Sequence, residues 1–290
     1  EFWWQEGHTI HETAEEAMAE TEQQLNCYAD VCKNALAMPV VKGRKTDKEK
    51  FAGAEATYTI EAMMKDHKSL QSGTSHFFGD KFSRAYDVTF TGRDNTLQYP
   101  FQTSWGSSTR LIGAVIMTHS DNHGLVLPPV IAPTQVVVIP IAQHKPGVLD
   151  AAAALKDRLT AAGLRVAMDD SEQSAGWKFA QYEMKGVPLR VEIGPKDMEK
   201  EQCCVARRDT GEKTFVPLAG LEDAIKGLLQ DVHDNLYNMA AKNLEENTFD
   251  MTDWHEVKAM ADGKGGLART KWCGSLECVL AMKEKAGVSS

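Results

Sequence analysis

The segment 101–129 constrains the fold of this chain more than any other, because it joins a strand to a helix and ends in two prolines. Residues 97–104 have the apolar alternation of a strand, and residues 106–117 have the apolar spacing of a helix. Pro128 and Pro129 favour neither element and mark a linker. We therefore expect a strand layer with a packed helix, ending near residue 129.

The regions on either side of this linker have different patterns. Before it, a helix at 13–37 and strands at 40–41, 55–64, 84–90 and 97–104 predict an antiparallel meander. After it, strands and helices alternate, which predicts an α/β domain covered by helices. Strands are expected there at 136–141, 165–168, 189–193, 205–208 and 213–216, and helices at 148–162, about 174–185 and about 220–245. Residues 246–290 are polar and weakly patterned, and we expect a third, smaller unit.

Composition excludes several classes of protein. Apolar residues make up 42% of the chain and charged residues 25%, as in soluble globular proteins. The sequence contains no apolar stretch near the ~20 residues of a membrane span and no signal peptide, so we expect a cytoplasmic protein without a membrane. The net charge of −9 argues against coating of nucleic acid by bulk charge, although a local basic face stays open. Buried free thiols are expected at Cys27, Cys32, Cys203 and Cys204.

Ser108, Thr109 and Arg110 follow the strand directly and open the helix. An arginine at a helix start can reach a phosphate, and nearby hydroxyls can position the rest of a nucleotide. The alternative is an ordinary helix N-cap beside a surface arginine, and these residues alone favour it.

Longer segments carry a resemblance to one family. Residues 104–114 (SWGSSTRLIGA) resemble motif 3 of class II aminoacyl-tRNA synthetases, in the form found in prolyl-tRNA synthetases. Residues 121–129 resemble that family's exit from the catalytic domain, and residues 1–8 (EFWWQEGH) resemble the second half of motif 2. Residues 40–53 and 71–76 resemble the proline-pocket segments of the eukaryotic and archaeal branch.

The resemblance implies both a fold and an activity. It implies a partial α+β antiparallel class II catalytic core over 1–129, an α/β anticodon-binding domain over 130–222, and a helix with a partial zinc-type domain over 223–290. The intact protein would be a proline–tRNA ligase that uses ATP and Mg²⁺ to make prolyl-adenylate and charges tRNA(Pro). It would act as a homodimer.

The resemblance also implies a proline site beside a nucleotide site. A pyrrolidine ring is best held by aromatic faces, and the implied proline-binding residues are Trp4, Phe51 and His76. The implied ATP-binding residues are Phe2, Gln71, Thr74, Ser108 and Arg110. Arg110 would also be catalytic, and His76 can stay neutral as a packed wall. Ser108 stands where the family usually has Thr, and plain core packing is the alternative for Trp4 and Phe51.

Some expected parts of the family are not in this sequence. Motif 1, the first half of motif 2 and the Thr-x-Glu loop should precede Glu1, so residues 1–8 are expected to lack a partner strand. Thr59-Ile60-Glu61 imitates the Thr-x-Glu loop but matches another segment, and we transfer no role to it. We expect this chain alone to be inactive.

The α/β domain carries candidates for reading an anticodon, because single-stranded bases are read by splayed stacking and hydrogen bonds. The candidates are Lys178, Arg190, Glu192 and Arg207. A basic strip would comprise Lys178, Lys185, Arg190, Lys196, Arg207 and Arg208. The alternative is a solvated charged face with ion pairs at strand ends.

Cys273 and Cys278 resemble the first cysteine pair of the family's zinc-type C-terminal domain. A structural Zn²⁺ takes four nitrogen or sulfur ligands, so a second pair would be needed beyond Ser290. His255 would substitute only by coincidence.

Two other functions stay open at this point. A non-catalytic relative that binds tRNA or regulates would also carry these segments. An unrelated α+β binding protein is the generic alternative.

Overall fold

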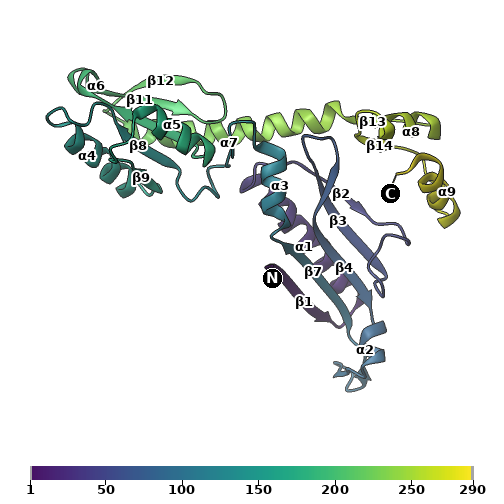
Figure 1. Cartoon of the computed structure of the whole chain (residues 1–290). Helices are drawn as coiled ribbons and strands as arrows, with labels where there is room; N and C mark the ends of the chain where they lie inside the picture. Colours follow the sequence, from purple (N-terminus) through teal and green to yellow (C-terminus); the bar gives the residue numbers. More distant parts are fainter. Residues whose placement is uncertain (1, 289–290) are drawn as a thin grey trace. The chain divides into compact units, whose positions relative to one another are not determined.

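The computed structural model describes residues 2–288, which form two compact units (Figure 1). Unit 1 comprises residues up to 33, 38–114 and those from 240 onward, and unit 2 comprises 34–37 and 115–239. The segment 115–129, which the sequence pattern groups with the first domain, is thus counted with unit 2. The domain limits near 129 and 222 stay predictions. No helix in the described chain is both long and apolar enough to cross a membrane.

Unit 1 is built on a five-stranded antiparallel sheet. Its strands lie in the order β1 (Trp4–His11), β7 (Phe101–Ser108), β4 (Ser69–Gly79), β3 (Ala56–Met63) and β2 (Val40–Arg44). Helix α1 (Ala14–Asn34) lies along one face of the sheet (Figure 1). Ala17 of α1 packs with Ala56 and Phe77 there, so apolar burial fixes the helix to the sheet. The opposite face stays available for ligands.

The first strand is paired, which corrects one expectation. All of β1 pairs with β7, from Trp4 opposite Ser108 to His11 opposite Phe101. The expectation that residues 1–8 lack a partner strand is therefore wrong. Strand β7, which lies far from β1 in the sequence, forms the backbone hydrogen bonds with it. Within the described residues, β1 is an edge strand of this sheet.

The middle of unit 1 departs from the expected meander in three places. The sequence pattern missed β4, because residues 69–79 alternate small and polar residues rather than apolar ones. The strand expected at 84–90 is instead helix α2 (Lys81–Ala85) followed by β5 (Phe90–Thr91), which pairs with β6 (Leu97–Gln98). Helix α3 (Arg110–His119) begins four residues later than expected from Gly106, because β7 continues to Ser108.

The C-terminal part of unit 1 has more structure than its weak pattern indicates. It contains β13 (Thr248–Asp250), α8 (Trp254–Asp262), β14 (Leu267–Arg269) and α9 (Leu276–Ala286). The turn between β3 and β4 contacts this part. His67 Nδ1 lies 2.9 Å from the carbonyl of Lys264, and the Asn243 amide donates to the carbonyl of Met64 at 3.2 Å.

Unit 2 is built on a five-stranded mixed sheet, which is consistent with the α/β domain that the alternating pattern predicted. Its order is β12 (Lys213–Pro217), β11 (Gln202–Arg207), β10 (Leu189–Ile193), β8 (Val136–Pro140) and β9 (Val166–Met168). The pairs β8–β10 and β8–β9 are parallel, and β10–β11 and β11–β12 are antiparallel. Its helices are α4 (Val148–Ala161), α5 (Ala175–Met184), α6 (Pro195–Glu199) and the part of α7 (Leu221–Glu246) that precedes residue 240.

Two apolar clusters cover the two faces of this sheet. On one face, Leu155 of α4 and Ile225 of α7 pack with Val138 of β8. On the other face, Phe179 of α5 packs with Val137 and Ile139 of β8. A strand buried on both faces explains why residues 136–140 read as a continuous apolar run.

The thiols follow the expected burial with one exception. Cys32, Cys203 and Cys204 are buried, whereas Cys27 is exposed, so the expectation for Cys27 is wrong. Helix α1 turns its buried stripe of Ala17, Thr21, Leu25 and Cys32 to the sheet, and Cys27 lies off that stripe. Burial raises the pKa of the Cys32 thiol to about 11.

Candidate functional site

The exposed face of the unit 1 sheet carries a cavity of about 590 Å³. Residues expected in the proline and nucleotide sites all line it, although they come from β1, the loop before β3, β4, β7 and α3. They are Phe2, Trp4, Phe51, Gln71, Thr74, His76, Ser108 and Arg110. Residues far apart in the sequence are thus collected on one surface.

Strand geometry explains why these side chains converge. Thr74 and His76 are two residues apart on β4, so they face the same side of the sheet. They lie opposite Gly106 and Ser104 of β7. Trp4 lies opposite Ser108 on the neighbouring strand pair. The sheet register, which a single strand does not reveal, therefore builds the floor of the cavity.

Aromatic rings form one wall of the cavity. The ring centroids of Phe51 and His76 are 5.0 Å apart, and those of His76 and Phe78 are 5.8 Å apart. Burial lowers the pKa of His76 to about 4, and the negative charge of Glu6 opposes this shift. His76 is therefore neutral at physiological pH and acts as a polar, uncharged part of an aromatic wall.

A second aromatic pair lies at the start of β1. The rings of Phe2 and Trp4 meet edge to face with centroids 5.5 Å apart. Phe2 is 65% exposed and Trp4 is 67% exposed, so both rings are free to take a ligand. Apolar faces exposed beside polar groups are typical of small-molecule sites.

Polar groups fill the side of the cavity near α3. Arg110 is the first residue of that helix and is exposed, and its backbone N–H donates to Ser108 Oγ at 3.2 Å. Its guanidinium donates to the carbonyl of Gln71 at 3.4 Å. This contact ties Arg110 to β4 and leaves its other donors for an anion at the helix N-terminus.

The sequence did not single out several residues of this site. Phe78 follows His76 by two positions, and strand alternation could have found it once β4 was recognised. Glu6 and His8 of β1 also line the cavity. Thr57, which contacts the wall from behind, has no sequence signal because its role depends on the β3–β4 register.

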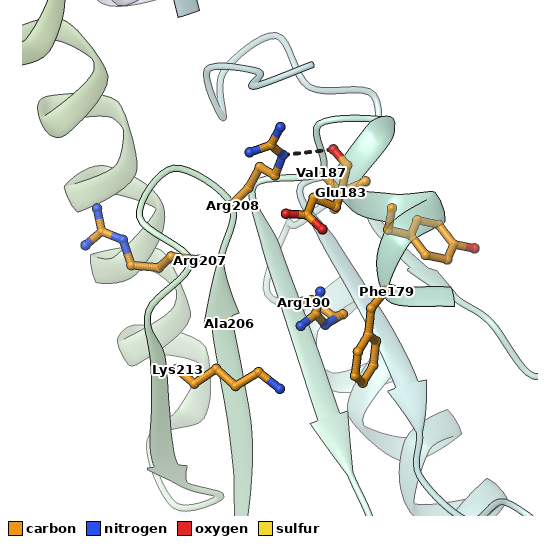
Figure 2. Close-up of a pocket in the computed structure, with 10 residues that line it drawn as sticks. Phe179, Glu183, Val187, Arg190, Ala206, Arg207, Arg208 and Lys213 are labelled. Atoms are coloured by element: carbon orange, nitrogen blue, oxygen red, sulfur yellow. Dashed lines mark hydrogen bonds between the residues drawn. The ribbon is translucent and has the colours of Figure 1, made fainter. Parts of the chain in front are cut away.

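Unit 2 has a smaller cavity of about 250 Å³, shown in Figure 2. Its lining brings together Phe179 of α5, Arg190 of β10 and Lys213 of β12. The Arg190 guanidinium lies 3.9 Å from the centre of the Phe179 ring, and Lys213 Nζ lies 5.0 Å from it. Glu192 binds both cations, at 2.9 Å from Arg190 Nε and 3.0 Å from Lys213 Nζ. The result is a platform of one aromatic ring and two cations, which the buried carboxylate of Glu192 holds together.

The other arginines of this cavity are engaged with the protein. Arg207 pairs with Asp209 at 2.6 Å and points toward α7, where it donates to the carbonyl of Asp231 (Figure 2). Arg208 binds both carboxylate oxygens of Asp121, at 2.7 and 2.8 Å. The hydrogen bonds from Arg208 hold the pKa of Asp121 well below its usual range. These charges stabilise unit 2 and are only partly available to a ligand.

Lys178 belongs to the expected basic strip, but it is buried. Its side chain is 2% exposed, and Nζ donates to the carbonyl of Asp169 at 2.9 Å and to Gln143 Oε1 at 3.1 Å. Lys178 is therefore not part of an exposed basic strip, because its ammonium group is bound to partners inside the domain.

The two C-terminal cysteines do not complete a metal site. Cys273 is exposed, and its Sγ lies 3.3 Å from Ser275 Oγ at the N-cap of α9. Hydrogen bonds from Ser275 and Cys278 lower the pKa of Cys273. Among residues 2–288, no group of three or more His, Cys, Asp or Glu side chains is placed to hold a metal ion. The residues present thus do not fit a four-ligand Zn²⁺.

Comparison with known proteins finds similarity to one family over the whole chain. Residues 135–228 match the family model described as the anticodon binding domain. Over all 290 residues the chain is 55% identical to proline–tRNA ligase 2 of Bacillus thuringiensis (strain Al Hakam) and 55% identical to proline–tRNA ligase of Ruminiclostridium cellulolyticum. Over its whole length the chain is thus similar to proline–tRNA ligases, which supports its assignment to the prolyl-tRNA synthetases. It spans 61% and 60% of the lengths of these two relatives.

The cavity of unit 2 lies within the segment that matches the anticodon binding domain. Every residue that lines it falls between positions 135 and 228, inside the matched anticodon binding domain. The relatives named above are bacterial, and they do not test the resemblance to the eukaryotic and archaeal branch. That assignment within the prolyl-tRNA synthetases stays a prediction.

Proposed function

We propose that the full-length protein is a proline–tRNA ligase, and that unit 1 holds part of its class II catalytic core. One observation carries the proposal: the residues implied by the family resemblance line a single cavity, with aromatic rings on one side and Arg110 on the other. The similarity to proline–tRNA ligases over the whole chain supports it. The alternative of a non-catalytic relative has no specific observation in its favour.

The aromatic side of the cavity suits the amino acid. Proline has a small apolar ring, which Trp4, Phe51 and the neutral ring of His76 would enclose. The absence of charge on His76 keeps this wall apolar enough for the ring. Phe2 offers a face on which adenine would stack, with Gln71 and Thr74 as hydrogen-bonding partners for the nucleotide.

The Arg110 side of the cavity suits the reacting phosphate. The proline carboxylate would attack the α-phosphorus in line, forming the acyl–phosphate bond as pyrophosphate leaves. Arg110 and the hydroxyl of Ser108 would hold phosphate or ribose oxygens and stabilise the developing charge. This reaction needs no side-chain nucleophile. The carboxylate of Glu6, which lines the cavity, would help to hold Mg²⁺, and the ion would supply charge neutralisation for the phosphates.

We propose that the unit 2 cavity takes a base of the tRNA(Pro) anticodon. Phe179 with Arg190 above it forms a stacking surface, and Lys213 adds a second cation. Glu192 holds both cations in place. From the family resemblance, we also propose a cytoplasmic homodimer.

Proline-dependent exchange between ATP and pyrophosphate by the full-length gene product tests the proposal. We expect exchange activity in the wild type and a loss of about 10²–10³-fold in R110A, the scale on which single charge-stabilising donors act. R93A is the matched control, because Arg93 is exposed in unit 1 and pairs with Glu12 outside the cavity. A wild-type protein that binds tRNA(Pro) without any exchange would instead support a non-catalytic relative.

A further inference from the structure

Thr57 lies behind the aromatic wall of the unit 1 cavity and contacts two of the residues proposed to hold proline. It lies on β3 directly opposite His76 of β4, and its side chain is nearly fully buried. Its Oγ1 is 3.0 Å from the backbone nitrogen of Phe51 and 2.9 Å from His76 Nδ1. One hydroxyl thus connects both parts of the wall.

The direction of these hydrogen bonds follows from the donors available. The backbone N–H of Phe51 can only donate, so the Thr57 oxygen accepts that bond. The hydroxyl proton then needs an acceptor, and among residues 2–288 the group within reach is His76 Nδ1. If Nδ1 carried a proton, the Thr57 O–H would be buried without an acceptor, which is costly. Thr57 therefore donates to an unprotonated Nδ1.

His76 must then carry its proton on the other ring nitrogen. A protonated imidazolium is disfavoured, because burial lowers the pKa of His76 to about 4 against the opposing charge of Glu6. In a neutral ring with an accepting Nδ1, Nε2 bears the proton. Nε2 has no hydrogen-bond partner in the described part of the chain, and His76 lines the cavity. The ring thus offers its N–H to whatever occupies the cavity.

We propose that Thr57 is a positioning residue of the proline site, which holds His76 as the neutral Nε2–H tautomer and directs that N–H toward an oxygen of the bound amino acid. The oxygen is a carboxylate oxygen of proline or the carbonyl oxygen of prolyl-adenylate. The same hydroxyl anchors the backbone of Phe51, so it sets both the shape and the polarity of this wall. The inference about the ligand rests on the proposed function. The inference about the tautomer does not.

The tautomer can be measured directly in the full-length protein. With ¹⁵N-labelled histidine, the His76 signals are identified by their disappearance in H76Q. We expect a pyridine-type Nδ1 and a pyrrole-type Nε2 at neutral pH. A pyrrole-type Nδ1 in the wild type would overturn the proposal without any variant of Thr57. This result is independent of whether the protein activates proline.

Two substitutions at Thr57 test the positioning role. T57V keeps the side-chain shape but removes the hydroxyl, and T57S keeps the hydroxyl. In ATP–pyrophosphate exchange, we expect T57V to raise the KM for proline roughly three- to tenfold, the effect of one lost neutral hydrogen bond. The KM for ATP should stay within about twofold, which also shows that the cavity is folded. T57S should restore the wild-type KM for proline.

The outcomes separate this proposal from the proposed function. A mixture of tautomers in T57V with the Nε2–H form restored in T57S supports the role of Thr57. A wild-type tautomer retained in T57V, or equal KM values for proline in T57V and T57S, overturns it. No exchange in the wild type refutes the proposed function instead, while the tautomer measurement still decides the state of His76.

Discussion

The two cavities differ in how they use their charged residues. In unit 1, the wall is built from aromatic rings and hydroxyls, and Arg110 is exposed at its edge. In unit 2, Arg207 and Arg208 are paired with carboxylates before any ligand arrives, and Glu192 binds both Arg190 and Lys213. A count of basic residues therefore overstates the number of positive charges that unit 2 has free to bind RNA. In unit 1, the residues expected from the sequence do line the cavity.

The largest expected effect concerns the buried charge of unit 2. K178M should lower the free energy of unfolding by about 2–4 kcal/mol, because it leaves the carboxylate of Asp169 buried without its cation. Chemical denaturation measures this loss, with K185M as a control at an exposed lysine. Affinity for tRNA(Pro), corrected for the folded fraction, should be unchanged. A loss of tRNA binding in fully folded K178M would contradict the conclusion that Lys178 serves only the stability of unit 2.

The aromatic wall of unit 1 should show the next largest effect. F51A removes a ring that is 52% exposed and packs against His76, so we expect proline binding to weaken about 10–100-fold. Isothermal titration with proline in the presence of ATP measures the change. Y86A removes an exposed aromatic side chain that does not line this cavity, and it should change affinity less than twofold. Equal effects of both substitutions would contradict the assignment of the wall.

The platform of unit 2 should show a smaller effect on RNA. R190A should weaken tRNA(Pro) binding roughly tenfold, because it removes the cation above the Phe179 ring. Arg158 is the matched control, since it pairs with Glu222 elsewhere on unit 2. Filter binding at fixed salt compares R190A with R158A. If the two substitutions weaken binding equally, bulk charge rather than this platform explains the affinity.

The last prediction is a dependence of stability on pH, whose effect is small near neutral pH and grows toward acid pH. In the folded chain the pKa of His76 is lowered to about 4, from a usual value of about 6.5. Between about pH 4 and pH 6.5, His76 is therefore protonated in the unfolded chain and neutral in the folded chain. His76 therefore opposes folding increasingly as pH falls from about 6.5 toward 4. Unfolding free energies across this range should fall less steeply in H76Q than in the wild type. Identical slopes would show that burial does not hold His76 neutral.

Much of the fold follows from local pattern, and the failures have physical causes. The strand at 136–140 and the helix at 148–161 were predicted because a continuous apolar run and an alanine-rich run closed by Gly163 are local signals. The strand β4 was missed because its cavity face carries Thr74 and His76 instead of apolar residues. The pairing of β1 with β7 joins residues that are 90 (His11 and Phe101) to 104 (Trp4 and Ser108) positions apart, which no local pattern reveals.

The site shows the same division. Family motifs identified the residues of the unit 1 cavity, including Trp4 and Phe51, for which the residue types alone favoured core packing. Thr57 was not found, because its function depends on lying opposite His76 across two strands. In unit 2, Lys178 was predicted from the sequence to contact the anticodon. The sequence does not reveal that Asp169 and Gln143 bind its ammonium group inside the domain.

The proposed binding of prolyl-adenylate in the unit 1 cavity can be measured by isothermal titration of the full-length protein with a non-hydrolysable prolyl-adenylate analogue. The alanyl analogue and the R110A variant are measured beside it. We expect one prolyl analogue to bind per chain and the alanyl analogue to bind more weakly, because it leaves the aromatic wall unfilled. R110A should show a large loss of affinity. Absence of binding, or equal affinity for both analogues with no effect of R110A, would contradict the proposed binding.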